Sequence, residues 1–235
     1  MRSKQLNLSS YDTDKITHRY LQWYDPILVP WIDKEIKLLE VGIYKGGSLR
    51  LWRDYFPLGI IVGVDLNLPE KFQPGERIQI FKGSQSDKQF LSEVANKTAP
   101  QGFDIIIDDA SHLGELTRIT FWHLFDNHLK PGGLYVIEDW GTGYWDDWPD
   151  GKALNPTKPL VSRIRSVLPV RISRRIKARC HSYGMVGFIK ELVDEQCASD
   201  VTRRTLEGKP SRASNFENLL ITPSIVFVRK AELAS

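Results

Sequence analysis

Short apolar runs rich in β-branched residues alternate along this 235-residue chain with longer segments of helical periodicity. Most of the runs are continuous rather than alternating, which is typical of parallel strands covered on both faces. Strand–helix–strand repetition predicts an α/β fold with a doubly wound, mostly parallel sheet. The predicted strands are Lys37–Ile43, Gly59–Leu66, Ile78–Lys82, Phe103–Ile107 and Leu134–Ile137. The predicted helices are Gly47–Tyr55, Asp87–Lys97, Leu113–Asn127 and Gly187–Cys197.

The two ends of the chain differ from this repeating middle. The segment Met1–Lys34 precedes the first strand, and we expect it to be an N-terminal helical extension. Near the other end, NLLITPSIVFVRK predicts two short strands joined at Thr222–Ser224, an antiparallel hairpin that closes one sheet edge. The simplest organisation is therefore the extension, residues 1–34, followed by one domain over residues 35–235.

Charge and composition narrow the classes of partner. The net charge of +3 is too small to demand a nucleic acid, and no apolar run reaches the roughly 18 residues of a membrane span. The first residues have no apolar signal region, so we expect a cytoplasmic protein in which Cys180 and Cys197 are free thiols. The basic stretch Arg163–Arg179 has three interpretations, namely a solvated helix face, a site for an anionic substrate, or, least favoured, a nucleic-acid contact.

Acidic side chains and a histidine directly follow two of the predicted strands. Asp108, Asp109 and His112 lie in FDIIIDDASH, and Glu138 and Asp139 lie in GGLYVIEDW. Acids at the ends of buried strands are costly unless they are paired, bind metal or act in catalysis. Capping of the next helix by Asp108 or Asp109, and an ion pair for Glu138, are the structural alternatives. The carboxyl ends of parallel strands are where α/β proteins bind ligands, which favours a metal-assisted site.

Glycines and polar residues after the first three strands indicate a nucleotide-like ligand. The first strand leads into LLEVGIYKGGSLRLW, where Gly42 begins a turn that lets a ligand approach the backbone. The spacing is not G-x-G-x-x-G, which disfavours a dinucleotide. Asp65 ends the second strand and could accept the ribose hydroxyls of an adenosine-type cofactor, although a turn aspartate is the alternative. In GSQSD, Gln85 and Ser86 could contact an adenine, whereas Ser86 or Asp87 could instead cap the next helix.

Several motifs occur in an order that resembles a known family. They are Y-x-T-D-K at Tyr11–Lys15, LEVGIYKGGSLRLW, YFPLGIIVGVDL, GSQSD, DIIIDDASH and PGGLYVIEDWGTGYW. Together they resemble the metal-dependent sugar O-methyltransferases of the macrocin and mycinamicin type, over about Tyr11 to Trp145. Ala110 stands where that family commonly has glycine, and Trp140 and Gly141 also depart from it.

The resemblance implies a Rossmann-like class I methyltransferase sheet that binds S-adenosylmethionine (SAM) and Mg²⁺. It implies Mg²⁺ ligands at Asp109, Glu138 and Asp139, and a general base at His112. The residues predicted to surround the cofactor are Glu40, Gly42, Ser48, Asp65, Gln85, Ser86 and Asp108. The acceptor would be a sugar hydroxyl of a natural-product glycoside or nucleotide sugar, and relatives of this kind suggest a homo-oligomer.

These residue types fit the chemistry of methyl transfer to a sugar. An alcohol is a poor nucleophile near neutral pH, so the reaction needs a base or a cation that lowers the hydroxyl pKa. Carboxylate oxygens are ligands that Mg²⁺ prefers, and His112 can face the same site from the connecting loop. A cephalosporin-hydroxylase-like methyltransferase acting on another diol, and a non-catalytic SAM-binding module, are the alternatives.

Aromatic residues flank the site in two places, and their roles stay open. Trp140, Tyr144, Trp145 and Trp148 could form a substrate wall or lid, or cover the sheet edge. In the N-terminal extension, Tyr20, Trp23, Tyr24 and Trp31 could form a helix docked on the core, a lid over the cofactor, or an oligomer contact.

Overall fold

A seven-stranded sheet forms the centre of the computed structural model, which describes residues 1–154, 183–203 and 205–232. The strand order is β3-β2-β1-β4-β5-β7-β6, with β1 to β5 parallel and β7 antiparallel to both of its neighbours. The strands are β1 (Lys37–Val41), β2 (Ile60–Asp65), β3 (Ile78–Lys82), β4 (Phe103–Asp108), β5 (Leu129–Glu138), β6 (Phe216–Ile221) and β7 (Ile225–Lys230). The predicted parallel sheet with a C-terminal antiparallel hairpin is confirmed.

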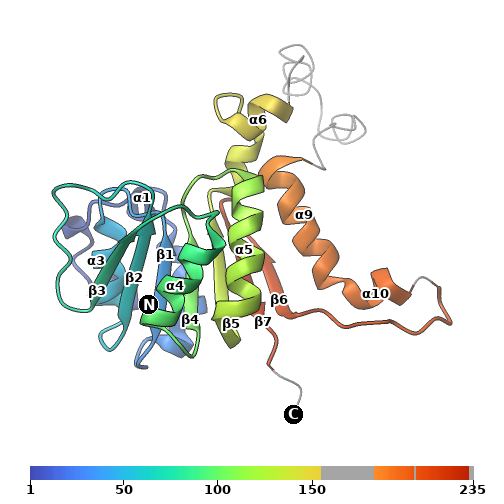
Figure 1. Ribbon diagram of the computed structural model, residues 1–235. Coiled ribbons are helices and arrows are strands. Elements are labelled where there is room, and N and C mark those ends of the chain that lie inside the picture. Colours follow the sequence, from blue (N-terminus) through green and yellow to red (C-terminus); the bar gives the residue numbers. More distant parts are fainter. Residues whose placement is uncertain (155–182, 204, 233–235) are drawn as a thin grey trace.

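Helices cover both faces of this sheet (Figure 1). One face packs against α4 (Lys88–Thr98), α5 (Gly114–His128) and α9 (Gly184–Gln196). The other face packs against α3 (Gly47–Tyr55) and the N-terminal pieces, of which α2 (Leu21–Leu28) is the longest. The shorter helices are η1 (Arg2–Gln5), η2 (Leu8–Ser10), α1 (Asp14–Thr17), η3 (Val29–Trp31), η4 (Trp140–Tyr144), α6 (Pro149–Leu154) and α10 (Ala198–Arg203).

The N-terminal extension docks onto the sheet. Tyr24 and Leu28 are 0% exposed, and Tyr20 and Trp31 are also buried in the same apolar cluster as α3. The segment before β1 consists of short helices, and Pro26 lies inside the longest of them, α2. Burial of these rings removes their apolar area from water and fixes the segment against the carboxyl end of the sheet.

The period of two along each strand decides which face receives each acid. In β1, Leu39 and Val41 pack in the α5 cluster, whereas Leu38 packs in the α3 cluster, so Glu40 faces α3. In β5, Val136 packs in the α3 cluster and Ile137 in the α5 cluster, so Glu138 also faces α3. Asp108 of β4 points to the α5 face.

A buried aspartate joins the starts of two helices. Oδ2 of Asp150 accepts the backbone N–H of Gly114 at 2.7 Å and that of Met185 at 2.7 Å, in the first turns of α5 and α9. The two helix starts approach so closely that a Cβ on Gly114 would lie 2.0 Å from the backbone of Gly184. The anionic carboxylate also suits the positive ends of both helix dipoles.

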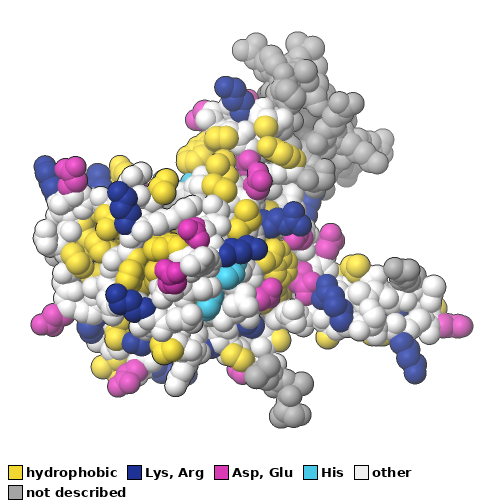
Figure 2. Space-filling view, in the orientation of Figure 1, with side chains coloured by type: hydrophobic (Ala, Val, Ile, Leu, Met, Phe, Trp, Pro, Cys, Tyr) yellow, Lys and Arg dark blue, Asp and Glu magenta, His cyan; other side chains and the backbone are white. Residues whose placement is uncertain are grey.

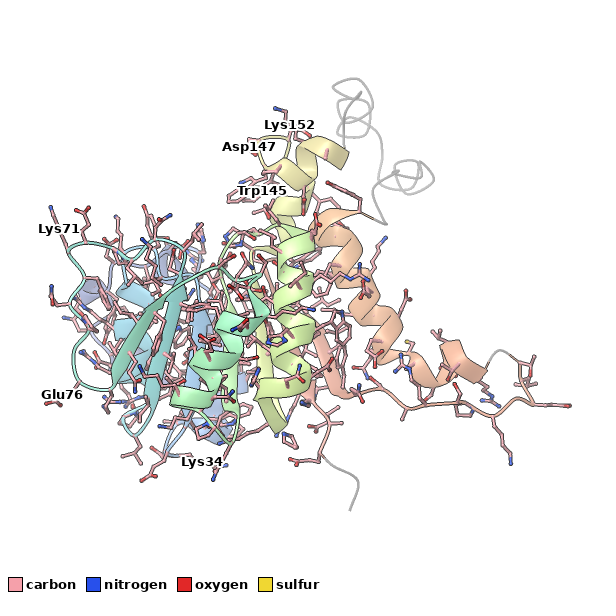
Figure 3. The ribbon with its side chains drawn as sticks, viewed as in Figure 1. Lys34, Lys71, Glu76, Trp145, Asp147 and Lys152 are labelled. Carbon is pink, nitrogen blue, oxygen red and sulfur yellow. The ribbon has the colours of Figure 1, made fainter. Side chains whose placement is uncertain are left out.

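We expect Asp150→Ala to lower the free energy of unfolding by about 3 kcal/mol, since it removes two charge-assisted hydrogen bonds from buried N–H groups. Urea unfolding followed by circular dichroism measures this. Asp147 is exposed on the segment leading to α6 and gives the control Asp147→Ala (Figure 3). Equal unfolding midpoints for the two variants would show that Asp150 does not tie the helices together.

Two histidines share one serine hydroxyl between α4 and α5. Ser92 Oγ lies 2.9 Å from Nε2 of His123 and 2.9 Å from Nε2 of His128. Figure 2 shows histidine side chains at the surface of this face. Burial lowers the pKa of His123, with help from the charge of Lys88, and burial together with His123 lowers the pKa of His128. These histidines therefore have a structural role, linking α4 and α5 through Ser92.

The lowered pKa values make stability depend on pH in one direction. In the unfolded chain both histidines have a pKa of about 6.5, whereas in the folded chain their pKa values are lower. As the pH falls below about 6.5, the unfolded chain therefore binds protons more readily than the folded chain, and the free energy of unfolding decreases. We expect the urea midpoint to fall between pH 7.5 and pH 5.5, and to fall less in the double variant His123→Gln/His128→Gln. An exposed-histidine control, His18→Gln, should follow the unmodified chain. Identical pH profiles for the chain and the double variant would contradict this.

No helix among the described residues is long and apolar enough to cross a membrane. Cys197 is exposed and forms no disulfide within the described part of the chain. Cys180 and the basic stretch Arg163–Arg179 lie outside the described residues.

Candidate active site

The carboxyl ends of β1, β4 and β5 bring a cluster of acids together with His112. One carboxylate oxygen from Asp109, one from Asp139 and a ring nitrogen of His112 lie within 4.8 Å of one another. The Nε2 atom of His112 is 3.9 Å from Asp109 Oδ1 and 3.9 Å from Asp139 Oδ2. Neighbouring parallel strands thus place residues far apart in the chain at one point, as the sequence predicted.

Local backbone geometry and a tryptophan hold this group in place. His112 and Asp139 have φ values of 53° and 55°, the left-handed region that is uncommon for residues with side chains. Such conformations cluster at functional sites, where the surrounding structure compensates the strain. The ring of Trp148 meets the imidazole of His112 edge-on at 5.3 Å between centroids.

Glu138 lies directly behind this group and has protein partners on both oxygens. The hydroxyl of Tyr24 donates to Oε1, and the Lys15 ammonium lies 2.8 Å from Oε2. Burial raises the pKa of Glu138 well above its usual value, although Lys15 opposes that shift. The structure therefore brings Asp109, Asp139 and His112 together at one open point and sets Glu138 beside Lys15. A metal role for Glu138 stays a prediction.

Lys15 is the functional side chain that sequence reasoning missed. Its side chain is 0% exposed, and its ammonium contacts Asp109, Glu138 and Glu40. Burial alone would lower the pKa of Lys15, but the three carboxylates outweigh burial and leave the pKa raised well above its usual value. The signal was present in the T-D-K motif, but the motif alone does not show which strand ends the lysine reaches.

Glu40 belongs to the same buried network. Its Oε2 accepts the hydroxyl of Ser48 at 2.7 Å, and its Oε1 accepts the indole N–H of Trp52 at 3.2 Å. Burial raises the pKa of Glu40, and Lys15 counters part of that shift. Both Glu40 and Ser48 are thus engaged in holding the strand to α3, and a direct cofactor contact for either stays a prediction.

A cavity of about 460 Å³ opens between the ends of β1, β2 and β4. Its volume falls in the range of small-molecule sites. Three of the predicted cofactor residues line it, namely Gly42, Asp65 and Gln85. Gly42 has φ of +102°, and a Cβ there would lie 2.0 Å from the backbone oxygen of Asp109, so only glycine allows these two loops to meet.

Backbone N–H groups hold the carboxylate of Asp65 in place at this cavity. Its Oδ2 accepts the N–H of Ile43 at 2.7 Å, and its Oδ1 accepts the N–H of Asn67 at 2.8 Å. Oδ2 also accepts the N–H of Tyr44 at 3.3 Å, so Oδ1 is the oxygen that keeps a further lone pair for a ribose hydroxyl. The ribose contact of Asp65 stays a prediction.

The sequence allowed two roles for the residues after β3, namely contact with an adenine and capping of α4. Gln85 lines the cavity, but its amide also accepts the N–H of Ser111 at 3.1 Å and donates to Thr120 at 3.2 Å, which ties the loop before α5. Asp87 caps α4 by accepting the N–H of Phe90 at 3.0 Å. Ser84 lines the cavity, whereas Ser86 lies 3.0 Å from the Ser84 hydroxyl and is not among the lining residues.

Asp108 points away from the acid cluster, as the strand period requires. It is 2% exposed on the α5 face and lines neither this cavity nor the one beside His112. Burial raises the pKa of Asp108 to about 7, and burial together with the nearby Asp108 raises the pKa of the Tyr135 hydroxyl. The structure therefore places Asp108 in the core, and its predicted cofactor contact stays a prediction.

A second cavity of about 600 Å³ adjoins the first and shares Gly42, Tyr44, Asp109 and Ala110 with it. His112 lines only this second cavity, together with Ser48 and polar residues of the N-terminal segment such as Thr13 and Asp14. A reactant that contacts both Asp109 and His112 must therefore reach into this space.

The aromatic segment after Asp139 has mixed roles. Trp140 packs partly buried against the core and donates its indole N–H to the carbonyl of Thr222 at 2.9 Å, so it covers the sheet edge. Trp145 is 55% exposed and lies in the segment between η4 and α6 (Figure 3). Tyr144 is also exposed.

Known proteins match more than half of the chain, although no family model matches it. The mycinamicin VI 2''-O-methyltransferase of Micromonospora griseorubida is 40% identical over 146 residues, which is 58% of this chain and 36% of the relative. A tetracenomycin rhamnosyl 2'-O-methyltransferase of Streptomyces olivaceus is 30% identical over 91% of this chain and 50% of the relative. The chain thus spans about half the length, or less, of these relatives.

Solved structures show the same relation. The MycE methyltransferase of the mycinamycin pathway, solved with Mg and SAH, has a TM-score of 0.67 at 30% identity and covers 90% of this chain and 49% of its own. A putative caffeoyl-CoA O-methyltransferase from Staphylococcus aureus, 14% identical with a TM-score of 0.50, shares the fold alone. The sheet is a class I methyltransferase sheet, and the predicted resemblance of this chain to sugar O-methyltransferases of the macrocin and mycinamicin type is confirmed.

Proposed function

We propose that this chain carries the catalytic site of a SAM-dependent, Mg²⁺-assisted O-methyltransferase that acts on a sugar hydroxyl of a natural-product glycoside or nucleotide sugar. The observation that carries the proposal is the meeting of two cavities at Asp109, with Asp65 in the first cavity and His112 in the second. Similarity to enzymes named for methylating macrolide and tetracenomycin sugars supports the same substrate class.

The donor set fits a hard divalent cation. Asp109, Asp139 and His112 converge within 4.8 Å, and three carboxylates, those of Glu40, Asp109 and Glu138, share a single ammonium among the described residues. This excess of negative charge in a buried place favours a cation, and carboxylate oxygens suit Mg²⁺. We propose Asp109 and Asp139 as ligands, joined by Glu138 as the family resemblance implies. When bound, Mg²⁺ would lower the pKa of an acceptor hydroxyl and stabilise its alkoxide.

The first cavity fits the methyl donor. Oδ1 of Asp65 would accept a ribose hydroxyl, and Gly42 leaves the backbone free for close approach. When bound, SAM supplies the methyl group to an oxygen placed in line with its sulfonium. The chain's own part is to hold donor and acceptor about 3–3.5 Å apart and to exclude water.

His112 would remove the acceptor proton. It lines the second cavity, and the edge of the Trp148 ring and the two carboxylates at 3.9 Å restrain its ring. A cytoplasmic location and a homo-oligomeric state belong to the same proposal and rest on the sequence and on the kind of relative.

An activity screen tests the proposal. The purified chain is incubated with SAM and Mg²⁺ over a panel of macrolide and aromatic-polyketide glycosides and nucleotide sugars, and methylated products are sought by mass spectrometry. We expect turnover on a glycoside with vicinal hydroxyls and its loss in EDTA. SAH binding without turnover on any acceptor would favour the non-catalytic module, and turnover only on non-sugar diols would favour the cephalosporin-hydroxylase-like alternative. Absence of SAH binding by calorimetry would end the proposal.

A further inference from the structure

The N-terminal segment supplies three donors to the acid cluster. Lys15 contacts Asp109 and Glu138, the hydroxyl of Tyr20 donates to Asp139 Oδ1, and the hydroxyl of Tyr24 donates to Glu138 Oε1. Each donor and its carboxylate are 94 to 123 residues apart in the sequence. The site is therefore complete only with this segment in place.

Lys15 occupies a position like that of a bound cation. Its Nζ lies 2.6 Å from Asp109 Oδ2, 2.8 Å from Glu138 Oε2 and 3.3 Å from Glu40 Oε1. The lysine and the two glutamates are at most 1% exposed, so bulk solvent does not screen their charges. Three carboxylates around one small positive centre would otherwise repel one another in a medium of low dielectric constant.

The hydrogen-bond partners divide the acid cluster into two parts. In the closed half every carboxylate oxygen has a protein donor, and in the open half the oxygens face His112. Every oxygen of Glu40 and Glu138 has a donor, from Lys15, Ser48, Trp52 or Tyr24. Oδ1 of Asp109 and Oδ2 of Asp139 face the His112 ring at 3.9 Å instead. Asp109 thus bridges the halves, with one oxygen on the ammonium and the other toward the open point, as a carboxylate bridges two ions in a dinuclear site.

We propose that Lys15 is a positioning residue that acts as a built-in cation, filling the place of a second divalent ion and restricting this site to one. Two-metal sites hold their ions about 3.5–4 Å apart on shared carboxylates, and the donors here would suffice for such a pair without the lysine. The ammonium fixes Asp109 and Glu138 at any metal concentration, so one ion meets ligands already in place. This inference rests on the proposed function for the use of the metal, but not for the number of ions.

Metal counting tests it on the full chain. Mn²⁺ binding is followed by electron paramagnetic resonance, with neither SAM nor acceptor present, in the unmodified chain and in Lys15→Met. We expect one Mn²⁺ per unmodified chain with no spin coupling, and a second, spin-coupled Mn²⁺ in Lys15→Met. Lys130→Met removes a lysine whose Asp104 partner lies 2.8 Å away, outside both cavities, and should bind one ion like the unmodified chain.

Stability gives a second readout that a merely packed lysine would not produce. In EDTA, Lys15→Met leaves two buried glutamates and the partly exposed Asp109 without their cation, and we expect its melting temperature to fall by about 10 °C. Mn²⁺ or Mg²⁺ should restore more of the melting temperature in Lys15→Met than it adds to the unmodified chain. An unchanged count of one ion in Lys15→Met, with equal stabilisation by metal, would overturn the inference.

The unmodified chain decides the matter if Lys15→Met does not fold. Two spin-coupled Mn²⁺ ions in that chain, or none, would also overturn the inference. Because these measurements need neither cofactor nor acceptor, a failure of methyl transfer alone would refute the proposed function and leave the ion count standing.

Discussion

Asp109→Asn is expected to abolish methyl transfer, with a loss of about 10³-fold or more in kcat/KM. In the described part of the chain, Asp109 is the one carboxylate that lines both cavities, and it contacts Lys15 at 2.6 Å and faces His112 at 3.9 Å. Loss of its charge removes a metal ligand, and a metal's stabilisation of a developing alkoxide is worth several kcal/mol, each 1.36 kcal/mol being tenfold in rate. Initial rates over a range of Mg²⁺ concentrations measure the effect.

The same variant separates metal binding from donor binding. Asparagine keeps the size of the side chain, and Asp65, at the far side of the first cavity, still holds its backbone partners. We therefore expect Mn²⁺ affinity to fall at least tenfold while SAH affinity, measured by calorimetry, changes less than about threefold. Asp104→Asn is a control at the opposite end of β4, where its carboxylate pairs with Lys130. Full activity of Asp109→Asn at ordinary Mg²⁺ would remove this residue from the catalytic centre.

The sheet could be predicted because its information is local. Continuous apolar runs located β1 to β4 to within two residues, and the hairpin of β6 and β7 was recognised from two runs and a turn. The exception is β5, which begins at Leu129, five residues before the predicted Leu134. The intervening Pro131-Gly132-Gly133 is typical of a turn, yet Leu129 pairs with Phe103 across a register shift, so tertiary pairing overrode the local preference.

The candidate site was predictable in part for the same reason. Strand-end acids identify the carboxyl edge of the sheet, and counting by two along β1 and β5 would also have put Glu40 and Glu138 on one face, opposite Asp108. Lys15 could not be placed in this way. No strand period governs a short helix that precedes the sheet, and only the docking of Tyr20 and Tyr24 brings its ammonium to the acids.

His112→Gln is the second large effect, an expected fall in kcat of about 10²- to 10⁴-fold, the range for loss of a general base. The imidazole lines the second cavity beside the edge of the Trp148 ring, and its Nε2 lies 3.9 Å from each of two carboxylates. Glutamine fills similar space and can donate a hydrogen bond, but it cannot accept a proton near neutral pH. Single-turnover rates with preformed donor complex measure the chemical step directly.

The geometry leaves a rival role for His112 that the same variant resolves. Its ring nitrogen is close enough to Asp109 and Asp139 to be a third metal ligand rather than the base. A base predicts Mn²⁺ affinity within about threefold of the unmodified chain together with the fall in kcat, because the carboxylates still hold the ion. A ligand predicts weakened Mn²⁺ binding, with activity partly recovered at high Mg²⁺. Trp148→Phe keeps an aromatic ring against the imidazole and should retain both the Mn²⁺ affinity and the kcat of the unmodified chain. A loss of either in Trp148→Phe would mean that ring packing, not the nitrogen, explains the effect of His112→Gln.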